Sequence, residues 1–199
     1  MCLLFETIKL KDGNFCNLHY HSERMNNARE KLFLSNKSID LEDALTVYEN
    51  CKTGIFKCRV EYDHNIHKIE FTPYNKREIK TLQLVFVDEI NYQYKYSDRS
   101  CFDRLKKKTN TDDILIVKNG FIADTSFSNI IFFDGNKWFT PSTPLLEGTK
   151  RKELLEKRII LEQEIRPRDL KNFKKAMLIN AMLDFDENTG IEMRNIINS

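Results

Sequence analysis

The sequence predicts an α+β fold in two domains. In the first half, a D-G pair at 12–13 and an H-N pair at 64–65 each separate short runs of alternating apolar and polar residues. Such alternation around tight turns is typical of an antiparallel sheet with one face solvated. Segments with helical periodicity lie between these strands. The second half repeats the pattern with its own turns and helices, so we expect a domain at 1–88 and another at 89–199.

The first half opens with a hairpin and a helix. We expect strands at residues 3–10 and 15–18, followed by a helix from about His21 to Leu34. A second helix is expected after Ser38, which stands at an N-cap position before I-D-L-E-D-A-L-T-V-Y-E-N-C, where apolar residues recur at helical spacing. An antiparallel pair of strands then completes the α+β half.

The second half begins after a strand at 81–87 and a polar, tyrosine-rich link, with the boundary near Asp88. An N-G pair at 119–120 lies between two β-branched runs and predicts a tight hairpin, and a D-G pair at 134–135 repeats the signal. A T-P pair then ends the strand, and G-T at 148–149 begins the charged helix K-R-K-E-L-L-E-K-R. Such a helix start, with unpaired backbone N–H groups, suits a phosphate.

Composition excludes several classes of protein. A chain of 199 residues can bury a real core, and a net charge of +2, from 32 basic and 30 acidic residues, creates no strong field for nucleic acid or an anionic membrane. We expect neither partner. No run has the apolar length of a membrane span, and M-C-L-L-F-E-T lacks the basic start of a signal peptide, so a cytoplasmic location is expected. The five cysteines are widely spaced and the histidines lack further ligands, so neither disulfides nor a metal site is expected.

A series of short motifs runs along most of the chain. They are F-E-T-I at 5–8, D-G at 12–13, H-S-E-R at 21–24, G-F-I-A-D at 120–124, N-I at 129–130, T-P at 140–141 and G-T-K-R at 148–151. Their order and spacing resemble the class IV aminotransferase family, the fold-type IV pyridoxal-phosphate enzymes. The resemblance implies a small α+β domain, a larger pseudo-barrel α/β domain and pyridoxal 5'-phosphate as cofactor.

The resemblance implies that Lys95 is catalytic and holds the cofactor covalently. K-Y-S-D-R, which starts there, is similar to the K-x-x-N-R of the family's aminodeoxychorismate lyases, with Asp98 where they carry Asn. Branched-chain aminotransferases have a tyrosine where this chain has Ser100. Tyr94 and Tyr96 can partly desolvate the amine between them, which lowers its pKa and frees a nucleophile. The alternative is a solvated lysine on a polar strand.

Asp124 matches the family's glutamate, whose carboxylate keeps the pyridine nitrogen of the cofactor protonated. Aspartate is one methylene shorter, and the alternative interpretation of D-T-S is a turn or cap. Asn129 matches the asparagine that follows in the family pattern, and we place it with the cofactor-binding residues.

The resemblance also names residues for the phosphate and the substrate. Arg24 matches the phosphate arginine of H-x-x-R, and its planar fork suits a dianion, although an exposed arginine on an amphipathic helix is the alternative. Thr149 and Lys150 match the helix-start positions that hold the phosphate. Asn180 resembles a pocket asparagine of the lyases, or else it satisfies buried backbone groups at a strand end. Arg59, on a strand of the small domain, is a candidate for the substrate's carboxylate.

The motifs are most similar to those of 4-amino-4-deoxychorismate lyase, a folate-synthesis enzyme that forms 4-aminobenzoate and pyruvate. The resemblance thus implies a small amino substrate and a homodimer. An amino acid aminotransferase, of the branched-chain or D-amino acid type, is the alternative enzyme. A non-catalytic binding protein with the same fold is the third hypothesis. It is favoured by Asp124 and by the absence of the strand and D-x-(G/A) turn that relatives carry before F-E-T.

Overall fold

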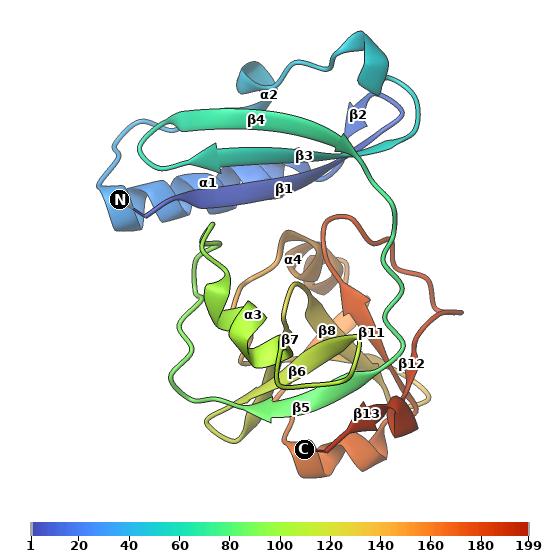
Figure 1. The fold of residues 1–199 in the computed structure, drawn as a ribbon. Helices are drawn as coiled ribbons and strands as arrows, with labels where there is room; N and C mark the ends of the chain where they lie inside the picture. The colour runs from blue at the N-terminus through green and yellow to red at the C-terminus, as the bar shows by residue number, and fades with distance from the viewer. Residues whose placement is uncertain (1, 199) are drawn as a thin grey trace. The chain divides into compact units, whose positions relative to one another are not determined.

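The computed structural model describes residues 2–198, which form two compact units. The first unit runs to Lys76 and includes Tyr94–Asp98, and the second contains Arg77–Gln93 and the chain from Arg99 onward. Figure 1 shows each unit as a set of strands with accompanying helices.

The boundary expected near Asp88 lies inside the second unit. The strand before it, β5 (Leu82–Phe86), pairs in parallel with β6 (Asp113–Lys118), so it belongs to a sheet of the second unit. The chain then returns briefly to the first unit at Tyr94–Asp98. The chain therefore passes between the two units three times, at 76/77, 93/94 and 98/99, in place of the single boundary expected from the sequence.

The first unit contains one antiparallel sheet in the order β2-β1-β3-β4. Its strands are β1 (Leu4–Lys11), β2 (Asn14–Phe15), β3 (Ile55–Tyr62) and β4 (Ile66–Pro73). The expected hairpin at 12–13 is confirmed: Asp12 and Gly13 have φ of 48° and 77°, and Lys11 pairs with Asn14. These positive φ angles are what a D-G pair provides in a two-residue turn.

One helix covers a face of this sheet. Helix α1 (Leu18–Phe33) begins slightly before the predicted start, and its Met25 and Ala28 pack with Leu4 and Ile8 of β1 (Figure 1). Because side chains alternate along a strand, Glu6 also faces this helix.

The predicted second helix is much shorter than expected. It is reduced to α2 (Leu41–Ala44) and a 3-10 turn, η1 (Glu49–Cys51). The N-cap is Asp40, whose Oδ1 accepts a hydrogen bond from the Glu42 N–H at 2.9 Å, and Ser38 does not fill this position. The β-branched pair T-V at 46–47 follows at once, and such residues lose side-chain freedom in a helix.

The second unit contains two mixed sheets, in the orders β13-β5-β6-β7 and β10-β9-β8-β11-β12. The other strands are β7 (Phe121–Thr125), β8 (Asn129–Phe133), β9 (Trp138–Pro141), β10 (Ile160–Gln163), β11 (Lys175–Ile179), β12 (Ile191–Glu192) and β13 (Ile196–Ile197). The helices are α3 (Ser100–Lys106), α4 (Thr149–Glu156), η2 (Pro167–Asn172) and η3 (Met193–Asn195).

Strand β8 is buried on both faces. Ile130 and Phe132 lie in a core shared with Leu84 of the other sheet, whereas Ile131 packs with Leu154 of α4. This double burial holds the start of β8, where Asn129 lies, firmly in place.

The two turn signals of the second half behave differently. Asn119 and Gly120 have φ of 50° and 79°, and Lys118 pairs with Phe121, so the tight hairpin is confirmed. At 134–137 the connection is longer, because Phe133 pairs with Trp138. There the Asp134 carboxylate accepts hydrogen bonds from the N–H groups of residues 136 and 137 and so shapes the loop.

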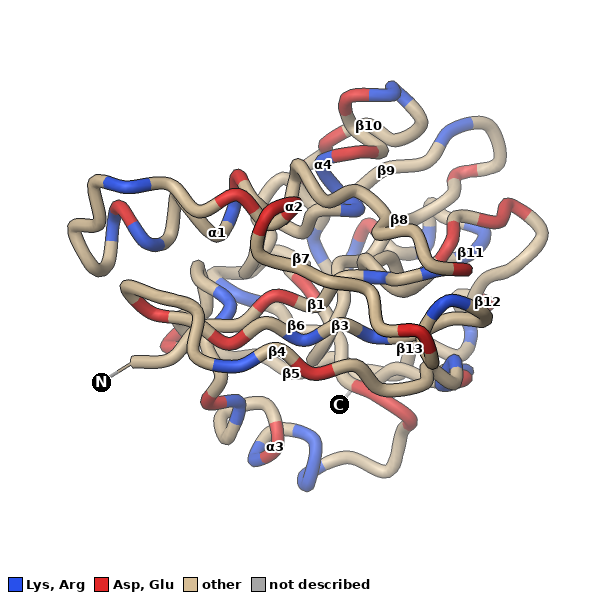
Figure 2. The backbone as a smooth tube through the Cα atoms, turned by 90° about the horizontal axis from the view of Figure 1, so that it is seen from above, with Lys and Arg blue, Asp and Glu red and all other residues tan. Residues whose placement is uncertain are grey.

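Charged side chains of both signs are interspersed along the backbone of both units (Figure 2). Within residues 2–198, no helix has the length and apolar character needed to span a bilayer. All five cysteines carry free thiols, but only Cys51 and Cys58 are buried.

Candidate active site

Lys95 lies on a short extended segment that continues the first sheet. The Phe5 N–H donates to the Lys95 carbonyl oxygen at 3.0 Å, and the Ser97 N–H donates to the Leu3 carbonyl oxygen at 2.8 Å. Tyr96 forms an antiparallel bridge with Leu4. The half-buried lysine is therefore attached by its backbone to the start of β1 and is not a freely solvated side chain.

Two cations share one aromatic ring in this unit. The Lys95 Nζ lies 4.8 Å from the centre of the Phe5 ring, and the Arg59 Cζ lies 3.8 Å from the same centre. Arg59 also donates to the Ser97 Oγ at 3.4 Å and to the Glu61 Oε1 at 2.8 Å. The structure thus brings Arg59 and Lys95, which the sequence assigned separately, to a common ring.

Arg24 is held by a buried carboxylate. Its Nε donates to the Glu6 Oε1 at 2.9 Å and its Nη2 to the Glu6 Oε2 at 2.5 Å, while the His21 Nδ1 lies 2.6 Å from the same Oε2. The Arg24 side chain is 18% exposed, which contradicts the alternative of an exposed helical arginine. A bidentate pair of this kind fixes the plane of the guanidinium.

The charges of this cluster follow from burial and pairing. Burial by itself raises the pKa of Glu6, but the charge of Arg24 and the hydrogen bonds from His21 and Arg24 outweigh it and lower the pKa to about 2. Burial lowers the pKa of His21, against the opposing effect of Glu6, so the imidazole is neutral. Because an ionised carboxylate only accepts hydrogen bonds, the His21 Nδ1 carries the proton.

Sequence reasoning assigned no role to Glu6 or His21. The sequence could have indicated a role for Glu6, because alternation along β1 places it on the same apolar face as Leu4 and Ile8. A charged residue on a buried face needs a partner.

Asp124 lies on β7 in the second unit and is almost fully buried. Its Oδ2 accepts from the N–H groups of Leu145 and Leu146 at 2.8 Å and 3.0 Å, and its Oδ1 accepts from the Asn129 Nδ2 at 2.8 Å. Burial raises the pKa of Asp124 to about 6, although these three hydrogen bonds and the charge of Arg151 oppose the rise. The carboxylate therefore remains ionised at neutral pH.

Asn129 connects Asp124 to the start of α4. Its Nδ2 also donates to the Leu146 carbonyl oxygen at 2.8 Å, and its Oδ1 lies against the backbone of Gly148, the N-cap of α4. One amide thus ties the carboxylate, the loop and the helix start together.

The beginning of α4 is suited to an anion. No side chain caps Gly148, and the first turn contains no acidic residue. Thr149 is buried, and the Lys150 Nζ pairs with the Glu153 Oε2 at 2.6 Å. The helix dipole favours an anion such as a phosphate at a helix start.

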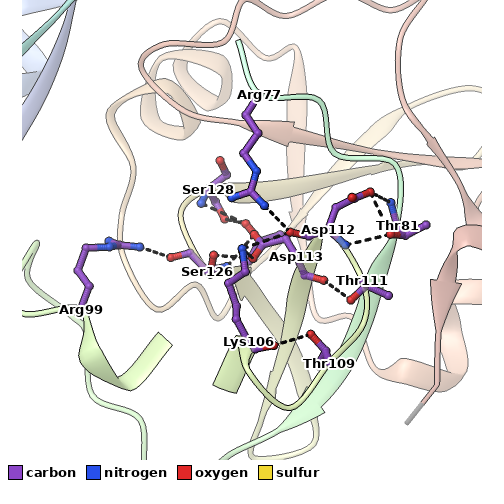
Figure 3. A network of polar contacts seen from close by, with 11 residues as sticks. Arg77, Thr81, Arg99, Lys106, Thr109, Thr111, Asp112, Asp113, Ser126 and Ser128 are labelled. Carbon is purple, nitrogen blue, oxygen red and sulfur yellow. Dashed lines mark hydrogen bonds and ion pairs between the residues drawn. The ribbon is translucent and has the colours of Figure 1, made fainter. Parts of the chain in front are cut away.

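Asn180 supports a turn next to this group. Its Nδ2 donates to the Ser128 Oγ at 2.8 Å and its Oδ1 accepts from the Met182 N–H at 2.9 Å. These contacts match the alternative that Asn180 satisfies buried polar groups. Ser128 belongs to the turn between Asp124 and Asn129 and is part of the polar network in Figure 3.

The predicted residues therefore form two groups, one in each unit. Lys95, Arg24 and Arg59 belong to the first, and Asp124, Asn129, Thr149, Lys150 and Asn180 belong to the second. The first group offers an amine at an aromatic ring and a guanidinium, and the second offers a buried ionised carboxylate and a helix start. This donor set fits pyridoxal phosphate, which needs a covalent attachment, a partner for its ring nitrogen and donors for its phosphate.

Known proteins share sequence and fold with this chain. Residues 95–185 match the family Amino-transferase class IV. An uncharacterized protein of Haemophilus influenzae is 35% identical over 182 residues, which are 90% of this chain and 97% of the relative. The crystal structure of a putative 4-amino-4-deoxychorismate lyase from Haemophilus somnus is 35% identical, with a TM-score of 0.87 over 93% of this chain and 98% of that one.

A hypothetical aminotransferase from Mycobacterium tuberculosis, solved in a PLP-bound form, has the same fold. It is 16% identical, with a TM-score of 0.73 over 90% of this chain and 78% of that chain. The chain belongs to the class IV aminotransferase family. It is a pyridoxal-phosphate-dependent enzyme with the mixed α/β fold of that family.

Proposed function

We propose that the protein is a lyase that converts 4-amino-4-deoxychorismate to 4-aminobenzoate and pyruvate. The supporting observation is the 35% identity to the putative lyase of Haemophilus somnus, which this chain covers over 98% of its length. The K-Y-S-D-R segment at 95–99 is similar to that of the lyases, and Ser100, the next residue, stands where branched-chain aminotransferases carry a tyrosine.

Lys95 is the catalytic residue of this proposal. Its Nζ would be the point of covalent attachment for the cofactor and, once the substrate's amine has taken that place, would take the proton from the substrate's α-carbon as a general base. Its attachment to β1 through the Phe5 hydrogen bond orients the side chain for both tasks. When bound, pyridoxal phosphate serves as the electron sink for the pair of electrons left by a broken bond at that carbon. Departure of pyruvate leaves an aromatic ring.

The second unit supplies the carboxylate and the helix start. Asp124 would serve as the carboxylate partner of the cofactor's pyridine nitrogen, which its negative charge would keep protonated. The helix start at Thr149 and Lys150 would hold its phosphate, and the guanidinium of Arg24, which Glu6 keeps oriented, is proposed as a further phosphate ligand. Asn129 holds Asp124, and Asn180 supports the neighbouring turn.

Arg59 is proposed to bind the substrate's carboxylate. Its guanidinium lies on the same Phe5 ring as the Lys95 Nζ, so a carboxylate there would keep an attached carbon within reach of the lysine. Arginine suits this task because its fork binds carboxylates through two parallel hydrogen bonds.

The proposal is tested with purified enzyme and 4-amino-4-deoxychorismate. Pyruvate and 4-aminobenzoate should form in equal amounts, whereas Lys95→Ala should form neither and Lys108→Ala, at an exposed site of the same charge, should retain the parent rate. An enzyme that instead exchanges amino groups between amino acids and keto acids is an aminotransferase. A protein that binds the cofactor and turns over neither substrate class is the non-catalytic alternative.

A further inference from the structure

Arg99 makes two hydrogen bonds that the proposed chemistry does not use. Its Nη1 donates to the Tyr92 Oη at 2.9 Å. Its Nη2 donates to the carbonyl oxygen of Ser126, as Figure 3 shows. The guanidinium also lies 4.9 Å from the centre of the Phe102 ring, which packs edge-on against Tyr92. The side chain is thus held by two acceptors and by aromatic surface.

Tyr92 and Arg99 flank the segment of the chain that contains Lys95. The chain leaves the second unit after Gln93 and returns to it at Arg99, and the excursion contains Lys95. The Arg99–Tyr92 hydrogen bond joins the two ends of this excursion and closes the loop 93–98. Closing a short loop removes conformations that its central residues could otherwise adopt.

The other acceptor is itself anchored. The Ser126 Oγ donates to the Asp113 Oδ1 at 2.5 Å and the Ser126 N–H donates to the Asp113 Oδ2 at 3.3 Å. Asp113 is fully buried and also pairs with the Lys106 Nζ at 3.3 Å (Figure 3). Ser126 stands two positions after Asp124. Arg99 therefore connects the ends of the loop 93–98 to the turn that follows Asp124.

We propose that Arg99 is a positioning residue for Lys95, which it serves by closing the loop 93–98 onto Tyr92 and fixing its ends to the Ser126 carbonyl. The inference rests on the proposed role of Lys95. Arginine suits the position because one planar fork reaches two acceptors, whereas the single ammonium of lysine lacks this geometry.

The test compares Arg99→Gln, Arg99→Lys and Tyr92→Phe with the parent enzyme. The rate at which the cofactor attaches to Lys95 in cofactor-free protein, measured by trapping with borohydride, and the kcat should both fall by about tenfold or more in Arg99→Gln, because small misplacements of a reacting group slow reactions strongly. The KM and the cofactor affinity should change much less, since the proposed substrate and phosphate contacts remain. Arg99→Lys should lie between Arg99→Gln and the parent.

Tyr92→Phe removes one hydroxyl and keeps the ring, so it tests the same hydrogen bond if Arg99→Gln does not fold. In cofactor-free protein, amide hydrogen exchange at 93–98 should also be faster in both variants. Arg104→Gln, at an exposed position on α3, and Tyr48→Phe, at a tyrosine 58% exposed, are matched controls that should leave every measurement unchanged.

Two results would overturn the inference. One is attachment of the cofactor to Lys95 at the parent rate in both Arg99→Gln and Tyr92→Phe. The other is an Arg99→Lys variant with the parent's attachment rate and kcat, which would show that only the charge matters. A label on another lysine in the parent enzyme would instead refute the role of Lys95. The failure of the proposed function is therefore distinguishable from the failure of the inference.

Discussion

The side-chain oxygen of Asn129 occupies the space where Gly148 would carry a Cβ atom. An added methyl would overlap the Asn129 Oδ1 and lie 3.2 Å from its Cγ. Gly148 has a φ of −75°, so any residue could adopt its backbone conformation, and only this contact demands glycine. The same Asn129 amide holds Asp124 through its nitrogen.

Gly148→Ala should therefore act on Asp124 through Asn129. We expect a loss of about 1 to 3 kcal/mol in unfolding free energy from overpacking, together with reduced turnover. Urea unfolding and steady-state kinetics measure the two effects.

A double-mutant cycle provides the control. Asn129→Ala removes both the clash and the hydrogen bond to Asp124, so adding Gly148→Ala to it should cost little more. If the losses in unfolding free energy of the two substitutions were fully additive, the alanine methyl would act on a residue other than Asn129.

Asp124→Asn should lower turnover while the cofactor stays bound. The variant keeps the size of the side chain but loses the charge that holds the pyridine nitrogen protonated, and it directs an NH2 group at existing donors. Asp124→Glu restores the family's residue but adds a methylene to a packed site, at about 1 to 3 kcal/mol. If the asparagine variant with bound cofactor matched the parent rate, Asp124 would have only its structural role in the loop.

Asp124 should also make the cofactor-free protein less stable as the pH rises. Because burial raises its folded pKa from 3.8 to about 6, the folded state holds this proton more tightly than the unfolded chain. The stabilisation is complete below the ordinary pKa and is lost as the pH rises through about 6, a change on the order of 2 to 3 kcal/mol. Urea unfolding of parent and Asp124→Asn at a series of pH values isolates this group, and a constant difference between them would contradict the shift.

Glu6→Gln should destabilise the first unit and weaken cofactor binding. Removing one partner of a buried ion pair costs about 3 kcal/mol or more, because the other charge loses its compensation. Arg24 would also lose the contact that orients its fork. Glu49→Gln breaks the exposed pair with Lys52 and should change the unfolding free energy by less than about 1 kcal/mol. Equal effects of the two substitutions would remove Glu6 from the proposed site.

We expect a homodimer in solution. The proposal follows from family membership and from the small size of the first unit, which suggests that a second copy is needed to complete the cofactor's surroundings. Sedimentation should give twice the monomer mass at working concentrations. A stable monomer with full activity would refute this prediction.

Much of the fold could be predicted because turn residues act locally. The D-G pair at 12–13 and the N-G pair at 119–120 adopt positive φ angles, and each forms the expected hairpin. The predicted length of the second helix was wrong. Four apolar positions at helical spacing suggested a longer helix, but the chain becomes extended at Leu45. Periodicity reports which residues can face a core, but packing decides the backbone they adopt.

The order and spacing of the motifs by themselves indicated the family and, through that resemblance, predicted the cofactor and the candidate site residues. Only the tertiary structure decided what holds those side chains: the Leu145 and Leu146 amides for Asp124, Glu6 for Arg24, and the Arg99 bridge between Tyr92 and Ser126. Except for Arg99 and Tyr92, these partners lie 18 or more residues apart along the chain. Local backbone preferences carry no information about them, and they meet only where the packing of sheets and helices brings them together.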